Sequence, residues 1–289
     1  MNSSPQDRPR LSSEALLLAS LAWNRLFPAQ GIPILCYHRI ADHGSISTVT
    51  PAAFRRQMQL LQAWGFRTLA LQELVTLLSC GHPLPRWRVV LTFDDGYACF
   101  YHEASTVLRE MGFTASVFVP TDYVGLPASW NKRVAAAGGN LLSWEEIKEL
   151  AQAGFSFYPH GLSHRRLTQL SNSELERELR GSRELLEARL GQPATVFCYP
   201  YGDCDARAER AARAAGFQAA CGLRPGLNRS ANQLWNLRRM MLLRTTSPRG
   251  FRARVTGAFS RYAGLRGWLR GSTSLTTSRR QSWRCRDVS

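Results

Sequence analysis

The chain has 289 residues, of which 44% are hydrophobic, so a globally disordered protein is excluded and a sizeable core can form. The formal net charge is +16, almost all of it from arginine. This charge favours anionic partners such as acidic lipid or charged glycan, unless it only reflects an arginine-rich genome. No zinc finger and no basic helix with interleaved aromatic residues is present, so we expect no nucleic-acid partner.

The first predicted element is an amphipathic helix in an N-terminal extension covering residues 1–30. The apolar run Ala15–Ala22 is only about half as long as a membrane span. A weak export signal is the alternative explanation of this run. The seven cysteines are scattered and include no Cys-x-x-Cys pair, so no disulfide framework is expected and a reducing, cytoplasmic location is favoured.

The middle of the chain alternates predicted strands with predicted helices. Apolar runs predict strands at Pro33–Tyr37, Arg88–Phe93, Thr114–Val119, Phe155–Pro159, Thr195–Tyr199, Gln218–Gly222 and Met240–Leu243. Caps and helical spacing predict helices at Thr50–Trp64, Phe100–Met111, Ser143–Gly154, Asn172–Leu190 and Asp205–Ala215. On the helix Asn172–Leu190, leucines share one face and charged residues occupy the other.

Strand–helix alternation predicts one α/β domain over residues 31–247. Its parallel strands would be covered by helices, in a barrel or in a doubly wound sheet. From Pro248 onward the pattern decays into an Arg-rich tail over residues 248–289, with a short amphipathic stretch at Phe251–Leu269. This tail and the N-terminal helix would suit peripheral contact with an anionic membrane.

Uncommon polar residues follow four of the predicted strands. They are His38, the pair Asp94-Asp95, His160, and Tyr201. Each alone has an ordinary explanation, since Asp-Asp-Gly is common in turns and a single histidine is often only hydrogen-bonded. Loops at the carboxyl ends of parallel strands converge on one mouth, however, so we expect these side chains to lie together.

The chemistry of these residue types suggests a metal site. His160 and His164 together with one carboxylate are a sufficient ligand set for a divalent catalytic metal. The second, adjacent carboxylate then remains free to act as a base toward a water whose pKa the metal lowers. Non-haem iron oxygenases use the same ligand set, so that class remains an alternative, although their folds are usually antiparallel.

Four segments resemble a known family, the polysaccharide deacetylases of carbohydrate esterase family 4. Residues 92–96 (Thr-Phe-Asp-Asp-Gly), 160–164 (His-Gly-Leu-Ser-His) and 197–202 (Phe-Cys-Tyr-Pro-Tyr-Gly) are similar to its three signatures. Residues 35–40 (Leu-Cys-Tyr-His-Arg-Ile) look like the opening of its circularly permuted poly-N-acetylglucosamine deacetylase subgroup. The resemblance extends from about Ile32 to Leu243.

The resemblance implies a distorted (β/α) barrel of about seven parallel strands. It also implies that Asp95, His160 and His164 hold one divalent metal ion and that Asp94 is the general base. Zinc suits this ligand set, with cobalt, nickel and iron(II) as alternatives.

The resemblance further implies the remaining catalytic roles. His38 would be the general acid that protonates the leaving amine, and no histidine follows His164 to take that role instead. The backbone N–H of Tyr201 would bind the oxyanion. Arg239 would pair with Asp94 and keep it ionised.

Three positions depart from the family pattern. Gly161 stands where Ser or Thr is usual, Arg165 where Pro is usual, and Asn131 where Asp is frequent. None of them removes a metal ligand, but Gly161 is expected to loosen the metal loop and Asn131 to alter a substrate contact.

The resemblance therefore implies a hydrolase that removes N-acetyl groups from N-acetylglucosamine-type residues. Its partner would be an N-acetylated exopolysaccharide, oligosaccharide or lipid-linked sugar. The alternative within the same fold is a glycan-binding protein with impaired catalysis, which the three departures would support.

Overall fold

A computed structural model describes residues 30–259 together with Leu18. The helix expected around Ala15–Ala22 and the end of the Arg-rich tail lie outside the described residues. Within the described part, no helix combines the length and the apolar character needed to cross a bilayer.

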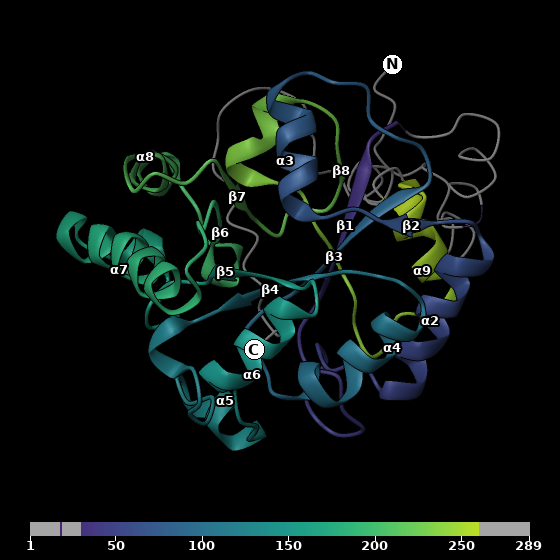
Figure 1. Cartoon of the computed structure of the whole chain (residues 1–289), viewed down its shortest axis with the longest axis horizontal. Helices are drawn as coiled ribbons and strands as arrows, with labels where there is room; N and C mark the ends of the chain where they lie inside the picture. The colour runs from purple at the N-terminus through teal and green to yellow at the C-terminus, as the bar shows by residue number, and fades with distance from the viewer. Residues whose placement is uncertain (1–17, 19–29, 260–289) are drawn as a thin grey trace, which may run out of the picture.

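The centre of the molecule is a mostly parallel β-sheet structure (Figure 1). Its strands are β1 (Ile32–Tyr37), β2 (Arg67–Thr68), β3 (Arg88–Phe93), β4 (Ser116–Val119), β5 (Ser156–Pro159), β6 (Val196–Cys198), β7 (Ala219–Cys221), β8 (Leu227–Asn228) and β9 (Met240–Met241). Among these, only the short pairing of β1 with β8 is antiparallel.

The strands follow a nearly closed circuit. β1 pairs with β3, β3 with β4, and β4 with β5. β6 pairs with β7, Cys221 of β7 forms a bridge with Leu237, and the chain then enters β9, which pairs with β1. β5 and β6 are neighbours, but no strand ladder joins them in the described part of the chain. The fold is thus the predicted α/β arrangement, with the circuit open between β5 and β6.

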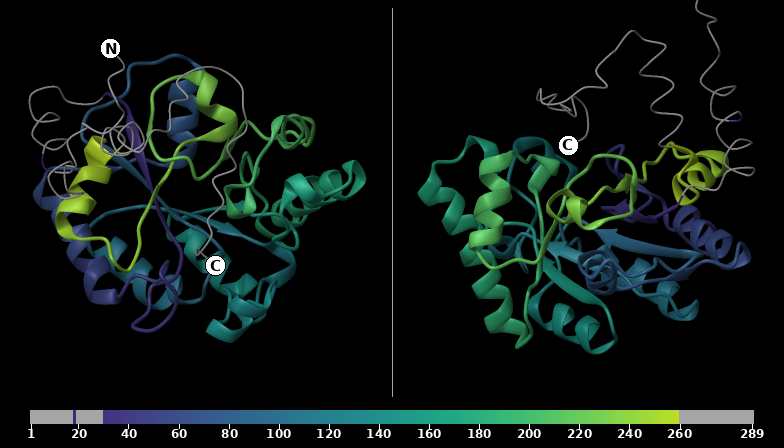
Figure 2. Two further views of the ribbon diagram at one scale, coloured as in Figure 1. Left: turned by 180° about the vertical axis from the view of Figure 1, so that it is seen from behind. Right: turned by 90° about the horizontal axis from the view of Figure 1, so that it is seen from above.

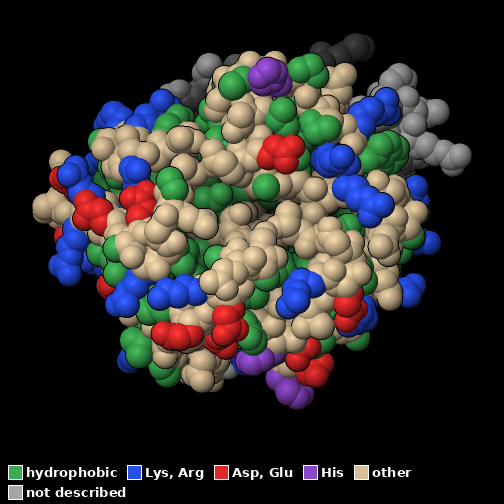
Figure 3. Space-filling view, viewed as in Figure 1, with side chains coloured by type: hydrophobic (Ala, Val, Ile, Leu, Met, Phe, Trp, Pro, Cys, Tyr) green, Lys and Arg blue, Asp and Glu red, His purple; other side chains and the backbone are tan. Residues whose placement is uncertain are grey.

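Helices surround the strands in all three views (Figures 1 and 2). They are α2 (Pro51–Ala63), α3 (Leu71–Ser79), α4 (Ser105–Glu110), α5 (Lys132–Ala137), α6 (Trp144–Gln152), α7 (Asn172–Leu190), α8 (Ala206–Ala214) and α9 (Pro248–Val255). Short helical turns are η1 (Phe100–Ala104), η2 (Thr121–Tyr123), η3 (Leu167–Gln169), η4 (Pro200–Gly202) and η5 (Ala231–Asn236). Basic and acidic side chains are interspersed on the face in Figure 3.

Local capping explains the helix boundaries. Ser143 and Glu146 form the predicted reciprocal cap at the start of α6. α7 has the predicted bounds and ends at Gly191, whose φ of 66° suits a residue without a side chain. The helix predicted over Phe100–Met111 instead begins as a π-helical turn and becomes α-helical only at Ser105.

The packed domain continues beyond residue 247. α9 buries Phe251 and Val255 in the same core as the residues that line α2. The ring of Phe251 lies 6.0 Å from that of Trp64, at the end of α2.

The alternation of side chains along the strands determines what points into the barrel. One apolar cluster gathers inward residues of successive strands: Ile34, Val90, Phe118, Tyr158 and Val196. Because side chains alternate across a strand, residues an even number of positions further along point the same way. These residues, at the carboxyl ends, are Cys36, Asp94, His160 and Cys198, and they are all buried.

Candidate active site

Asp95, His160 and His164 converge at the carboxyl ends of β3 and β5. Oδ1 of Asp95 lies 3.2 Å from Nε2 of His164 and 3.6 Å from Nε2 of His160. One ligand atom from each residue falls within 4.8 Å of the other two, and all three residues are buried. The structure thus brings together the three residues predicted as metal ligands.

The ring of His160 is oriented by the backbone of β6. Its Nδ1 lies 2.8 Å from the carbonyl oxygen of Cys198, which can only accept a hydrogen bond, so Nδ1 carries the proton. Burial, and then the neighbouring His164, lower the pKa of His160 from 6.5 to about 4. At neutral pH the ring is therefore uncharged, and its Nε2 presents a lone pair.

This orientation makes the site suitable for a cation. The lone pair on Nε2 of His160 faces the carboxylate oxygen of Asp95, so two acceptors confront each other without a proton between them. A cation between these atoms would turn the unfavourable contact into two coordination bonds. The donor set of two imidazoles and one carboxylate fits a divalent transition metal such as zinc.

Strained backbone accompanies the site. Among the described non-glycine residues, positive φ angles occur at Trp87 and at three site residues: Asp95 (72°), His164 (56°) and Tyr201 (60°). Such conformations cost about 1–3 kcal/mol each and persist where the surroundings enforce them. Strain concentrated in this way is typical of functional sites.

Asp94 and Arg239 form a buried, two-pronged ion pair inside the barrel. Nη1 of Arg239 donates to Oδ1 of Asp94 at 2.5 Å, and Nη2 donates to Oδ2 at 2.7 Å. Nε of Arg239 also donates to the carbonyl oxygen of Gly222 at 2.7 Å. Burial raises the pKa of Asp94, but the guanidinium outweighs it and holds this pKa well below its usual range. Asp94 is therefore ionised at neutral pH.

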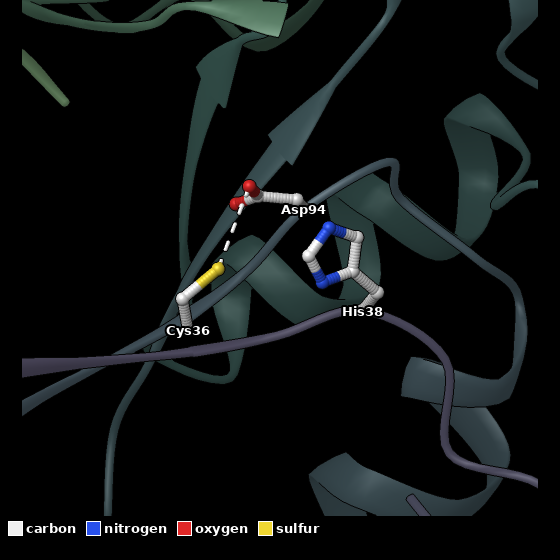
Figure 4. A group of neighbouring side chains, drawn as sticks. All are labelled: Cys36, His38 and Asp94. Atoms are coloured by element: carbon white, nitrogen blue, oxygen red, sulfur yellow. Dashed lines mark hydrogen bonds between the residues drawn. The ribbon is translucent and has the colours of Figure 1, made fainter. Parts of the chain in front are cut away.

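His38 and two thiols surround the Asp94 carboxylate. Figure 4 shows the side chains of Cys36 and His38, two residues apart in the chain, both pointing toward Asp94. The Sγ atoms of Cys36 and Cys198 lie 3.6 and 3.8 Å from Oδ2 of Asp94. Burial raises the pKa of both thiols well above its usual value, so they remain protonated donors. Nδ1 of His38 is buried and has no hydrogen-bond partner in the described structure.

Tyr201 lies at the rim of the metal-ligand cluster. Its ring centroid is 4.7 Å from that of His164. The guanidinium carbon of Arg166 lies over the Tyr201 ring, 4.2 Å from its centroid. The ring of Trp130 lies 4.5 Å from His164. Aromatic surfaces therefore frame the cluster, and the tight turn at Tyr201 brings the backbone of η4 to this rim.

The three departures from the family pattern have local explanations. Asn131 caps α5, where its side chain accepts a hydrogen bond from the N–H of Val134, and its Nδ2 lies 3.5 Å from the Tyr201 hydroxyl. Arg165 is exposed and pairs with Glu174 at 3.0 Å. Gly161 has a φ of 80° and lies beside the carboxylate of Glu178 on α7.

Sequence comparison identifies a domain of known family within the chain. Residues 82–220 match the profile described as polysaccharide deacetylase. This chain carries a polysaccharide deacetylase domain. A relative from Bacillus subtilis (strain 168), named putative polysaccharide deacetylase YxkH, is 29% identical over 205 residues, covering 71% of this chain and 69% of that protein. The oxygenase alternative is therefore excluded, and the domain belongs to a class of hydrolases.

A second relative is the poly-beta-1,6-N-acetyl-D-glucosamine N-deacetylase of Escherichia coli (strain K12). It is 25% identical over 289 residues, which cover 87% of this chain but only 41% of that protein. The chain thus spans less than half the length of this relative.

Solved deacetylase structures share the fold. The deacetylase PplD of Streptococcus pyogenes, in complex with acetate, superposes with a TM-score of 0.69 at 26% identity, covering 79% of this chain and 99% of that chain. IcaB from Ammonifex degensii gives a TM-score of 0.69 at 25% identity, with coverages of 80% and 98%. The deacetylase domain described here therefore accounts for nearly the whole of both solved chains.

Proposed function

We propose that this deacetylase domain is a divalent-metal-dependent N-deacetylase of N-acetylglucosamine residues in a polysaccharide or oligosaccharide. The observation that carries the proposal is the meeting of Asp95, His160 and His164 next to an ionised, arginine-paired Asp94. This arrangement supplies a metal-binding carboxylate and a separate base, which hydrolysis of an unactivated amide requires.

The metal would be held by Oδ1 of Asp95 and by Nε2 of each histidine. When bound, a divalent ion supplies Lewis-acid polarisation of the substrate carbonyl and lowers the pKa of coordinated water. Zinc is the ion we propose, because the ligand set is nitrogen-rich and neutral histidine is its common partner. Cobalt, nickel and iron(II) are the alternatives.

The proton transfers are assigned to two neighbouring residues, Asp94 and His38. Asp94 takes a proton from the water that attacks the acetamide carbonyl. His38 gives a proton to the departing nitrogen, so that water and the amide become acetate and a free amine. The proposal for His38 is supported by its place beside Asp94 and by its buried Nδ1, which has no hydrogen-bond partner among the described residues.

The oxyanion and the sugar would be held at the rim. The backbone N–H of Tyr201 is proposed to donate to the oxyanion that forms during attack. The half-buried ring of Trp130 lies beside His164 and is proposed to contact the pyranose ring. The named activity of the Escherichia coli relative supports N-acetylglucosamine as the sugar.

Acetate release from β-1,6-linked N-acetylglucosamine oligomers tests this function. We expect acetate and one new primary amine per event, abolition by a chelator, and recovery when zinc or cobalt is added back. O-acetylated xylan oligomers serve as the comparison substrate, with an ester in place of the amide. Chelator-insensitive release, or release only from the ester, would contradict the proposal.

A further inference from the structure

The loop that carries both histidines, residues 160–164, is fixed at its carbonyl groups by one neighbour. The N–H of Thr121 donates to the carbonyl oxygen of Gly161 at 3.1 Å, and the N–H of Asp122 donates to that of Leu162 at 3.0 Å. Both donors belong to η2, which follows β4. The loop's own N–H groups need acceptors from another part of the molecule.

Glu178 of α7 supplies those acceptors. Its Oε2 accepts hydrogen bonds from the backbone N–H groups of Leu162 at 2.8 Å and Ser163 at 3.1 Å. Its Oε1 accepts a short hydrogen bond from the Ser163 hydroxyl. Glu178 is 5% exposed, and no ion pair of its carboxylate occurs among the described residues. All three donors to this buried carboxylate therefore come from the metal loop.

Gly161 leaves the space that the Glu178 carboxylate occupies. A Cβ atom at position 161 would lie 2.9 Å from Oε2 of Glu178, closer than a side chain tolerates. The φ of 80° at Gly161 also disfavours any residue with a side chain. Glycine at 161 and the carboxylate at 178 thus depend on each other, and the departure at 161 does not leave the loop unsupported.

Packing of the helix interface does not by itself explain why a carboxylate is buried at position 178. Removing its charge from water is unfavourable unless hydrogen bonds compensate, and an apolar residue would pack there at lower cost. The bonds at Glu178 end one residue before His164, whose φ of 56° is itself strained. A fixed backbone at Leu162 and Ser163 is what holds that strained residue in place.

We propose that Glu178 is a positioning residue for the metal centre. With Gly161, it fixes the loop backbone so that His160 and His164 both direct Nε2 toward Oδ1 of Asp95. The consequence for metal affinity rests on the proposed metal-dependent function. The consequence for the loop backbone does not, because it concerns the metal-free protein as well.

The test compares Glu178→Ala and Glu178→Gln with Glu176→Ala in the full chain. Glu176 is the matched control, since it lies on the same helix but is exposed and forms an ion pair with the exposed Arg180. Circular dichroism establishes that each variant is folded. Zinc dissociation constants are measured by competition with a chelating dye, and amide hydrogen exchange follows residues 160–164 in the metal-free proteins.

We expect zinc binding to weaken by about 10- to 100-fold in Glu178→Ala, the usual effect of losing a residue that orients metal ligands. Glu178→Gln should fall between, because an amide retains only one acceptor oxygen. Exchange at Leu162 and Ser163 should accelerate in both variants. If Glu178→Ala does not fold, Glu178→Gln decides.

Wild-type zinc affinity together with unchanged exchange in the Glu178 variants would overturn the proposal, as would equal effects in Glu176→Ala. A wild-type protein that binds zinc but releases no acetate would refute the proposed activity and leave this role for Glu178 standing. If the wild type binds no divalent metal, the metal centre is refuted, and exchange rates in the metal-free proteins decide the role of Glu178.

Discussion

Nε2 of His160 faces Oδ1 of Asp95 at 3.6 Å, while Nδ1 of the same ring is committed to the carbonyl oxygen of Cys198. Two acceptors held together in a buried site favour a cation between them. Added zinc should therefore stabilise the protein, by about 2.7 kcal/mol at a hundredfold excess over its Kd. Thermal unfolding with and without zinc measures this effect. His160→Ala should remove the zinc-dependent shift, and a shift that persists in this variant would contradict the ligand assignment.

The same histidine predicts how the metal-free protein responds to acid. The pKa of His160 is about 4 in the folded chain and 6.5 for an unperturbed histidine, as in the unfolded chain. The unfolded chain therefore binds more protons than the folded chain between pH 4 and 6.5. Stability should therefore fall as pH falls from 6.5 towards 4. Urea unfolding at several pH values, in wild type and His160→Gln, measures the slope. A variant with the same slope as the wild type would assign the acid sensitivity to another group.

Removing Arg239 should affect both stability and the pH profile. Arg239→Met leaves the Asp94 carboxylate buried without its partner, which typically costs about 3–5 kcal/mol. Without the guanidinium, burial raises the pKa of Asp94, so the acid limb of the rate profile should move to higher pH. Arg109→Met, at an exposed site, is the control. An acid limb that stays in place would mean that Asp94 is not the titrating base.

The role of His38 predicts a change at the alkaline end of the pH–rate profile. If His38 protonates the leaving nitrogen, His38→Ala should lower kcat by about two to four orders of magnitude. The alkaline limb of the kcat profile should also disappear. His43→Ala, an exposed histidine on the following loop, should change neither quantity. An alkaline limb that survives in His38→Ala would point to another acid.

Gly161→Ser introduces the residue type that is usual in the family, but we expect it to harm this chain. The new Cβ would press against Glu178, in addition to the backbone strain of a positive φ. Gly154→Ser is the matched control, because its φ is 92° and a Cβ there meets nothing within 4 Å. Stability should fall by more than about 1 kcal/mol in both variants. Zinc affinity should fall only in Gly161→Ser; equal zinc affinity in the two would show that the space at Gly161 is not needed.

Much of the fold follows from local sequence patterns. The boundaries of α7 were predictable because Gly191 ends the helix and the leucine spacing identifies its buried face. The strand ends were predictable because runs such as Arg88–Phe93 are short, apolar and β-branched. These features depend only on residues close in sequence, and the convergence of strand ends then follows from parallel topology.

Other features depend on contacts between distant segments. Sequence patterns did not predict the short β2 and the helix α3, and they did not single out Glu178. Glu178 lies one position before Leu179 and three after Leu175, so its helical position permits burial. Its burial depends on hydrogen bonds from the N–H groups of Leu162 and Ser163, which belong to a loop distant in sequence. Helical spacing carries no information about such partners.

The central claim is that Asp94 is the base while Asp95 is a metal ligand. Acetate release by zinc-loaded Asp94→Asn tests this claim most directly. Metal content is determined on the same sample, because Asp95, His160 and His164 remain to hold the ion. We predict one bound zinc per chain and acetate release from N-acetylglucosamine oligomers reduced by about two to four orders of magnitude. Near-normal release by the zinc-loaded variant would contradict the assignment of Asp94 as the base.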